Sequence, residues 1–155
     1  MHVNGALDIQ ELAVPPGQKH TPASLGLHVD PSPRISVNEG DGWCSIEIAP
    51  LDESKHLLPL ATIAREKSRF ILSIPRYSFL SLYFVRIGDK LHWSTNIGAL
   101  AAEMDDPRTN KTYERFGLKY QFWPDGETVY AQIKKLVPGQ QMIVKAHGQH
   151  IGPVP

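Results

Sequence analysis

The stretch FLSLYFVRIGDKLHWST, residues 79–95, decides the fold that we expect for this chain. Two runs of apolar and aromatic residues, 80–87 and 90–95, flank the pair Gly88-Asp89. A Gly-Asp pair between two such runs favours a two-residue hairpin turn of the primed type. The stretch therefore predicts two antiparallel strands that are joined directly at this pair.

Further strand signals lie on both sides of this hairpin. Residues 60–65 and 69–74 are typical of a second hairpin, and Pro75 ends it because proline has no amide proton to donate. Alternation over 43–49 predicts a strand that is half buried on the Cys44 side. We expect the remaining strands at 2–9, 25–29, 34–38 and 141–145.

Two helices are expected after the central hairpin. Asn96 is a suitable N-cap for the segment NIGALAAEM, 96–104. The segment NKTYERFGLKYQF, 110–122, contains Gly117, which is expected to weaken or end the second helix. Its apolar side is predicted to consist of Tyr113, Phe116, Leu118 and Tyr120.

The segment that follows is expected to close the fold. Pro138-Gly139 favours a turn before the strand at 141–145. Most of the aromatic residues are expected in the core. The buried anchors of the closing segment are predicted to be Val129, Ile133 and Leu136.

Length and composition restrict the class of protein. The 155 residues, 41% of them hydrophobic, suffice for one domain with a core, which we place at 1–150 with a tail at 151–155. With 16 basic and 16 acidic residues, the chain offers no basic stripe for nucleic acid and no charged run for a membrane surface. The single cysteine, Cys44, has no partner for an internal disulfide and favours a cytoplasmic setting.

Taken in order, the later segments resemble the closing part of the glutamine amidotransferase domain of asparagine synthetases and their relatives. In that family a "PLYY" strand pairs with a "FASE" strand, a helix "IKAL" follows, and a "T-x-F-x-G-I-x-x-L-x-P-G" segment closes the domain. The counterparts here are SLYF at 81–84, WSTN at 93–96, IGAL at 97–100, and Thr128 through the LVPG at 136–139.

The resemblance extends with less specificity toward the N-terminus. The hairpin at 60–74 resembles a hairpin of the family, and MHVNGALDI at 1–9 resembles its opening "MCGIAGVFD". Between Ile9 and Leu51 the resemblance nearly vanishes. It implies an α+β, antiparallel β-rich fold of the N-terminal nucleophile (Ntn) hydrolase type, a two-sheet sandwich with few helices. Because the early helices look shortened or missing here, we expect a reduced sandwich that is open on one side.

The family's nucleophile is absent from this chain. Amidotransferases of this type use a Cys at position 2, whose free α-amine serves as the base. His2 stands at that position, and because a bulky residue follows Met1, we expect Met1 to be retained. The family's Arg-Asp pair is replaced by Ile74-Pro75. We therefore expect no catalytic residue and no glutaminase activity, with His2 as a degenerate nucleophile position.

The resemblance implies a role in amide-bond biosynthesis without catalysis. We expect a domain that supports or docks to an asparagine synthetase-like, ATP-dependent amide ligase of the asparagine synthetase, β-lactam synthetase or peptide cyclase type. The family's own ligase domain carries a "SGGxDS" phosphate loop that is not found here. Candidates for the partner surface are Phe122 and Trp123, just past the second helix.

Two other functions stay open. The chain could be a small-molecule binder or enzyme that reuses the ancestral glutamine cleft, with His2 as general base and Asn4 and Arg76 as further cleft candidates. It could also be a structural protein that self-associates through edge strands. His147 and His150 alone have a spacing near that of a metal site, but a solvated tail is the better interpretation of this segment, and we expect neither metal nor cofactor.

Overall fold

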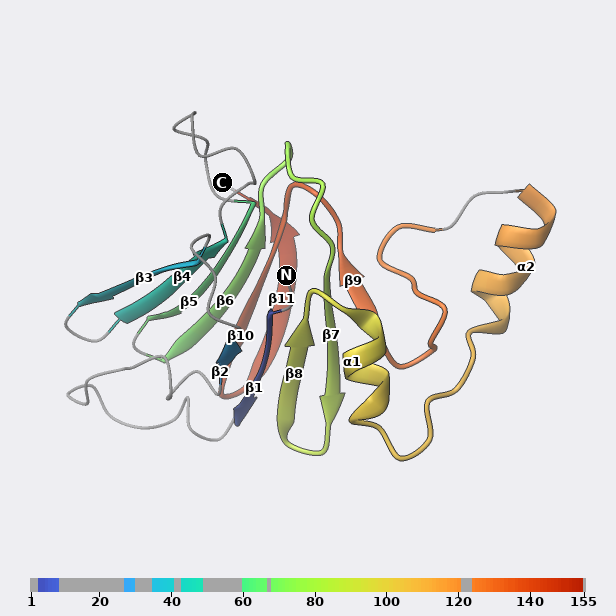
Figure 1. Ribbon diagram of the computed structural model, residues 1–155, viewed down its shortest axis with the longest axis horizontal. Coiled ribbons are helices and arrows are strands. Elements are labelled where there is room, and N and C mark those ends of the chain that lie inside the picture. Colours follow the sequence, from blue (N-terminus) through green and yellow to red (C-terminus); the bar gives the residue numbers. More distant parts are fainter. Residues whose placement is uncertain are drawn as a thin grey trace.

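The computed structural model describes residues 3–8, 27–29, 35–40, 43–48, 60–66, 68–120 and 124–154. These residues form a β-rich antiparallel protein with two sheets and two helices (Figure 1). This agrees with the coarse fold class that the sequence predicts. Among the described residues, no helix is both long and apolar enough to cross a bilayer.

Sheet A has five strands in the order β2-β1-β8-β7-β9. The N-terminal strand β1 lies in the interior of this sheet, where it pairs with β2 on one side and with β8 on the other. The predicted central hairpin is confirmed as β7 and β8, and Gly88 takes a φ of 59° in its turn. The bounds of the strands are β1 Val3–Asp8, β2 Leu27–Val29, β7 Leu82–Ile87, β8 Lys90–Ser94 and β9 Lys134–Leu136.

Sheet B has six strands in the order β11-β10-β6-β5-β4-β3. The second predicted hairpin is confirmed as β5 and β6, which pair from Thr62 opposite Ser73 to Glu66 opposite Arg69. The bounds of the strands are β3 Ile35–Gly40, β4 Trp43–Ile48, β5 Ala61–Glu66, β6 Arg69–Ile74, β10 Gln140–Lys145 and β11 Gly148–Pro153.

The two sheets pack face to face around one apolar core. Because side chains alternate along a strand, every second residue of the paired hairpins points inward. Trp93 and Phe84 of sheet A meet Phe70 and Leu72 of sheet B in this core, and all four are buried. Ile48 is fully buried too, which agrees with the burial predicted for its side of β4.

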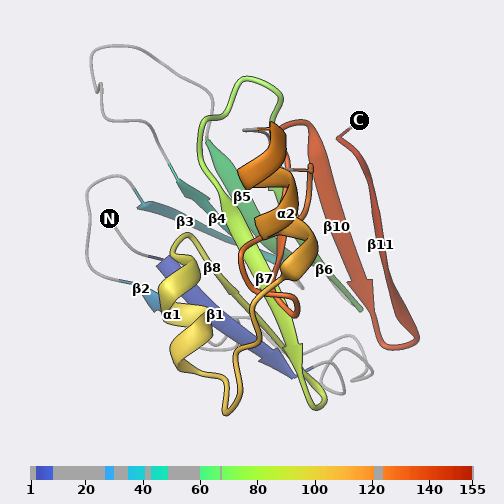
Figure 2. The same cartoon turned by 90° about the vertical axis from the view of Figure 1, so that its right-hand side faces the viewer.

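The outer face of sheet A is covered by α1 (Ile97–Ala102) and by the segment before β9. Leu100 and Ile133, from these two segments, pack with Val85 in a second apolar cluster. The predicted cap of α1 is confirmed, because the Asn96 side chain accepts a hydrogen bond from the Gly98 amide. Both helices lie on the sheet A side of the molecule, as Figures 1 and 2 show.

The second helix, α2 (Lys111–Tyr120), forms as expected but does not bury its apolar side. No residue of α2 is buried, and the Leu118 side chain is 88% exposed. Figure 1 shows α2 at the edge of the molecule, away from both sheets. Gly117 lies inside the helix and does not end it. The helix is confirmed, but the expectation that its aromatic residues lie in the core is wrong for Phe116 and Tyr120, because α2 has no sheet face beneath it.

Two predictions for the closing segment are wrong as well. Ile133 and Leu136 are buried as expected, but Val129 is 39% exposed, in a segment whose backbone pairs with residues 108–110 just before α2. Gly148–Pro153 forms β11 against β10 instead of a solvated tail. Three residues of the expected tail, 151–153, therefore belong to sheet B.

The strand registers give the sandwich two distinct ends. At the loop end lie the start of β1, the 75–81 loop between β6 and β7, and the Pro138-Gly139 turn. At the hairpin end lie the Gly88-Asp89 turn of sheet A and the Ala146-His147 turn of sheet B. The two ends carry different side chains, and the candidate sites are described separately for each.

Candidate functional site

A row of polar positions crosses sheet A at the loop end. Asn4 of β1 lies opposite Ser94 of β8, Ser94 lies opposite Tyr83 of β7, and Tyr83 lies opposite Lys135 of β9. Ser94 is fully buried, and its hydroxyl accepts a hydrogen bond from the Asn96 amide at 2.9 Å. This row, which we call the β1-head row, lies on the face that α1 covers.

The three predicted cleft residues have different outcomes. His2 lies outside the described residues. Asn4 holds its register position in the β1-head row. Arg76 is exposed in the loop between β6 and β7, and its side chain lies over Gly139, where an added Cβ would be 2.8 Å from the Arg76 Cγ. The structure thus gives Arg76 a packing contact at the loop end.

The predicted partner surface, Phe122 and Trp123, lies outside the described residues. The structure adds two exposed aromatic side chains that the sequence reasoning missed, Tyr77 and Phe79, in the loop between β6 and β7. The signal in the sequence was the run RYSF after the strand-ending Pro75. Pro75 ends β6, and the loop that follows runs over the surface, where Tyr77 and Phe79 are exposed while Ser78 between them is buried.

The helix α2 is held to the rest of the chain by a small polar network at its N-terminus. Asn110 caps the helix, because its Oδ1 accepts from the Tyr113 amide at 3.1 Å. The Asn110 Nδ2 donates to Glu127 Oε2 at 2.7 Å, and the Lys134 ammonium donates to Glu127 Oε1 at 2.7 Å. The hydrogen bond from Lys134 is the largest influence on the Glu127 carboxyl and holds its pKa below the ordinary value, against a smaller opposing effect of burial.

The side chain of Tyr113 couples α2 to the β1-head row. Burial raises the pKa of its phenol, and the nearby Tyr83 phenol raises it further. Tyr83 lies on β7 in the row itself. The first turn of α2 therefore has an electrostatic influence from Tyr83 of the β1-head row, while the rest of the helix extends away from sheet A.

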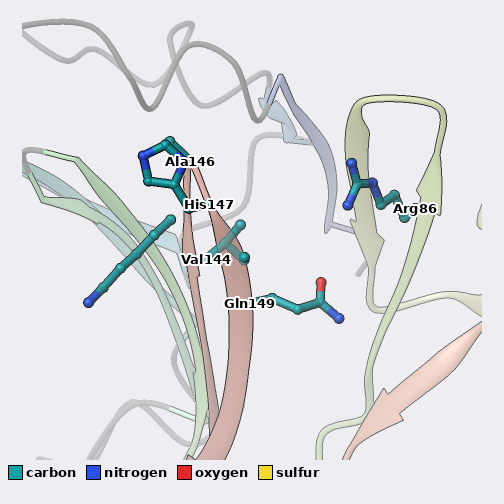
Figure 3. A pocket seen from close by; sticks show the side chains of 7 residues that line it. Arg86, Val144, Ala146, His147 and Gln149 are labelled. Atoms are coloured by element: carbon teal, nitrogen blue, oxygen red, sulfur yellow. The ribbon is translucent and has the colours of Figure 1, made fainter.

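The hairpin end carries two hollows, one on each side of the β10–β11 turn. The first has a volume of about 270 Å³ and lies between the two sheets. Figure 3 shows Arg86 of sheet A and Gln149 of β11 facing each other across it, with His147 above the turn. The Arg86 guanidinium is 3.6 Å from the Asp89 carboxylate, so part of its charge is already balanced.

The second hollow, of about 420 Å³, lies on the outer face of sheet B and shares the turn residues with the first. Arg69, Lys145 and His150 line it, and Ile143 contributes an apolar side chain. We call it the outer hollow. This hollow was not predicted: the spacing of His147 and His150 drew attention to the last hairpin, but Arg69 comes from β6, far away in the chain.

Comparisons with known proteins add no assignment to this geometry. No protein-family model matches the chain, and no curated protein sequence matches it.

Proposed function

We propose that this chain is a non-catalytic, glutaminase-like domain of the Ntn type that docks to an asparagine synthetase-like, ATP-dependent amide ligase. One observation carries the proposal: β1 lies in the interior of sheet A, between β2 and β8, within a sandwich of two antiparallel sheets. In the amidotransferase family the residue at the head of this strand is the nucleophile. In this chain position 2 holds His.

The loss of the nucleophile has a direct chemical consequence. A Cys thiolate attacks the glutamine amide and forms a covalent acyl-enzyme, and its own α-amine acts as the base. An imidazole at position 2 supplies no thiolate for this step. The two antiparallel sheets around β1 are present without this nucleophile, which supports a role in binding a partner.

The first experiment measures glutamine hydrolysis and ligase binding with the same purified chain. Ligase halves of the asparagine synthetase, β-lactam synthetase and peptide cyclase types are produced without their own glutaminase-like domains. We expect no ammonia release from glutamine, and a one-to-one complex with at least one of these ligases by light scattering after gel filtration. Glutamine hydrolysis by the chain, or binding to none of the three ligase types, would reject the proposal.

Two variants locate the surface in the same experiment. Phe122→Ser combined with Trp123→Ser is expected to weaken ligase binding by about tenfold or more, as the loss of aromatic anchors does at protein interfaces. Ile151→Ser is the matched control, because Ile151 is an exposed apolar residue of β11 in the outer strand of sheet B. Equal loss of binding in both would contradict the choice of Phe122 and Trp123.

A second candidate function rests on the β1-head row. Its buried Ser94 and the neighbouring Tyr83, Lys135 and Asn4 positions resemble the polar lining that a small-molecule site needs. In this function the chain binds glutamine or glutamate, with His2 as the base. Calorimetry with both amino acids tests it, and His2→Ala is expected to remove the binding heat. Absence of any heat with the unmodified chain would reject it.

A further inference from the structure

Two positively charged residues lie next to each other in the outer hollow. Lys145 of β10 lies directly opposite Arg69 of β6, and like charges in this position destabilise a sheet. On the other side of Arg69, Glu66 of β5 lies opposite it in register. The Arg69 Nε donates to Glu66 Oε2 at 2.9 Å, so the carboxylate balances Arg69. Lys145 is exposed and its charge stays on the side of the hollow.

The surroundings of Lys145 leave room for a ligand. The residue opposite Lys145 on β11 is Gly148, which has no side chain to cover the ammonium. Its φ of 153° is one that other residues rarely adopt, so the turn itself favours a glycine here. His147, Gln149 and His150 add to the polar lining of the outer hollow, and none of the described residues that line it is acidic.

The charges and the apolar surface of the outer hollow indicate which class of ligand fits it. An ammonium and a guanidinium on one wall repel a metal cation, although two imidazoles are present. They attract an oxyanion instead, and a phosphate offers three acceptor oxygens to these two donors where a carboxylate offers two. Ile143 supplies an apolar surface beside the cations. The best match is a phosphate group attached to an apolar body.

We propose that the outer hollow binds a phosphate monoester, whose oxyanion contacts Lys145 and Arg69 and whose apolar group packs on Ile143. This site is separate from the β1-head row and does not depend on the proposed docking to a ligase. Glu66 competes with the ligand for Arg69. Removing its charge therefore strengthens binding, an effect opposite to that of removing Lys145.

The test is a titration of the full chain with phenyl phosphate, inorganic phosphate and, as a salt control, sodium chloride at equal ionic strength. The imidazole proton resonances of His147 and His150 are followed at constant pH. We expect saturable shifts with both phosphates and tighter binding of phenyl phosphate, because only it reaches Ile143. Tighter or equal binding of inorganic phosphate would assign the hollow to a free anion and contradict the apolar contact.

Three variants make the test specific. Lys145→Glu is expected to weaken phenyl phosphate binding by about tenfold or more, as the loss of one charge-assisted contact does. Lys90→Glu is the matched control, since it makes the same charge change at an exposed position of β8 that does not line the hollow. Glu66→Gln is expected to tighten binding about threefold by releasing Arg69 from its carboxylate partner.

The proposal is overturned by either of two results. One is that the phosphates cause no saturable shift beyond that of chloride. The other is that Lys145→Glu and Lys90→Glu weaken binding equally, which would mean that only the overall charge of the molecule matters. Circular dichroism of each variant confirms that it is folded, and the gain in Glu66→Gln cannot arise from unfolding.

Discussion

Asn110 joins two parts of the chain through one side chain. Its Oδ1 caps α2 and its Nδ2 holds Glu127. Asn110→Ala is expected to lower the free energy of unfolding by about 1–2 kcal/mol, the usual effect of losing a cap. Asn110→Ser keeps a cap acceptor and loses only the contact with Glu127. Its free energy of unfolding should therefore fall by less than that of Asn110→Ala. Urea unfolding of both variants checks this order, and an equal loss would mean that the cap contributes little.

The Glu127 carboxylate should make stability depend on pH in the acid range. Its pKa is lower in the folded chain than the ordinary value of 4.5, mainly because Lys134 donates a hydrogen bond to it. The stabilisation is therefore fully present above pH 4.5 and is lost as the pH falls through the folded pKa. We expect the difference in thermal midpoint between the unmodified chain and Glu127→Gln to shrink from pH 7 to pH 3. A constant difference would contradict this assignment.

Gly139 and Arg76 form a coupled pair at the loop end. Gly139 has a φ of 85°, and an added Cβ would meet the Arg76 Cγ. Gly139→Ala is expected to cost about 1–2 kcal/mol for the backbone conformation alone, and more for the contact. In the Arg76→Ala background only the backbone part remains, so a double-mutant cycle by urea unfolding should give a coupling energy. Additive effects would show that the Arg76 side chain moves away freely.

Single residues with a local signal were predictable from the sequence, whereas those with a distant partner were not. Asn96 and Gly88 act within their own turns, and both have the expected roles. The contact of Arg76 with Gly139, which is 63 positions away in the chain, was not predicted. Contacts of this kind depend on how the loops meet at the end of the sandwich, and no local pattern encodes that.

At the scale of elements, α1 and α2 differ in what lies beneath them. Leu100 of α1 is fully buried against sheet A, whereas Leu118 of α2 is 88% exposed. Leu100→Ala should cost about 2–5 kcal/mol, as large-to-small changes in a core do. Leu118→Gln should change the free energy of unfolding by less than about 0.5 kcal/mol. Chemical denaturation measures both, and a large loss in Leu118→Gln would mean that α2 packs on another surface in solution.

This contrast shows which part of an element the sequence predicts. Both helices were expected, and both form with bounds close to those expected. The apolar spacing of 110–122 predicts an amphipathic helix, but it does not say whether a partner surface is available within the same chain. Strands differ from α2 in this respect, because the partner surface is present in the same chain. Ile48 of β4, for example, packs in the core between the two sheets. The β11 strand was missed because Gly148 and Pro153 gave it a weak strand signal.

At the scale of the whole molecule, the interface between the two sheets joins segments from both ends of the chain. Sheet A takes its strands from the first residues, the middle and 134–136, while sheet B takes its last hairpin from 140–153. Neither sheet can bury its inner face alone, since the core contains residues of both. The molecule should therefore unfold as one unit, and the composition already indicated a single core.

A substitution at Leu72 tests directly whether the molecule unfolds as one unit. It is fully buried in the core between the sheets, while Ile71, its neighbour on β6, faces the other side of sheet B and is only partly buried. Leu72→Ala is expected to lower the free energy of unfolding by about 2–5 kcal/mol, and Ile71→Ala by clearly less. In both variants, tryptophan fluorescence, which includes the buried Trp93 of sheet A, should change at the same urea concentration as the far-ultraviolet circular dichroism. If Leu72→Ala separated the two transitions, sheet A and sheet B would be independent units, and one core would be the wrong description of the fold.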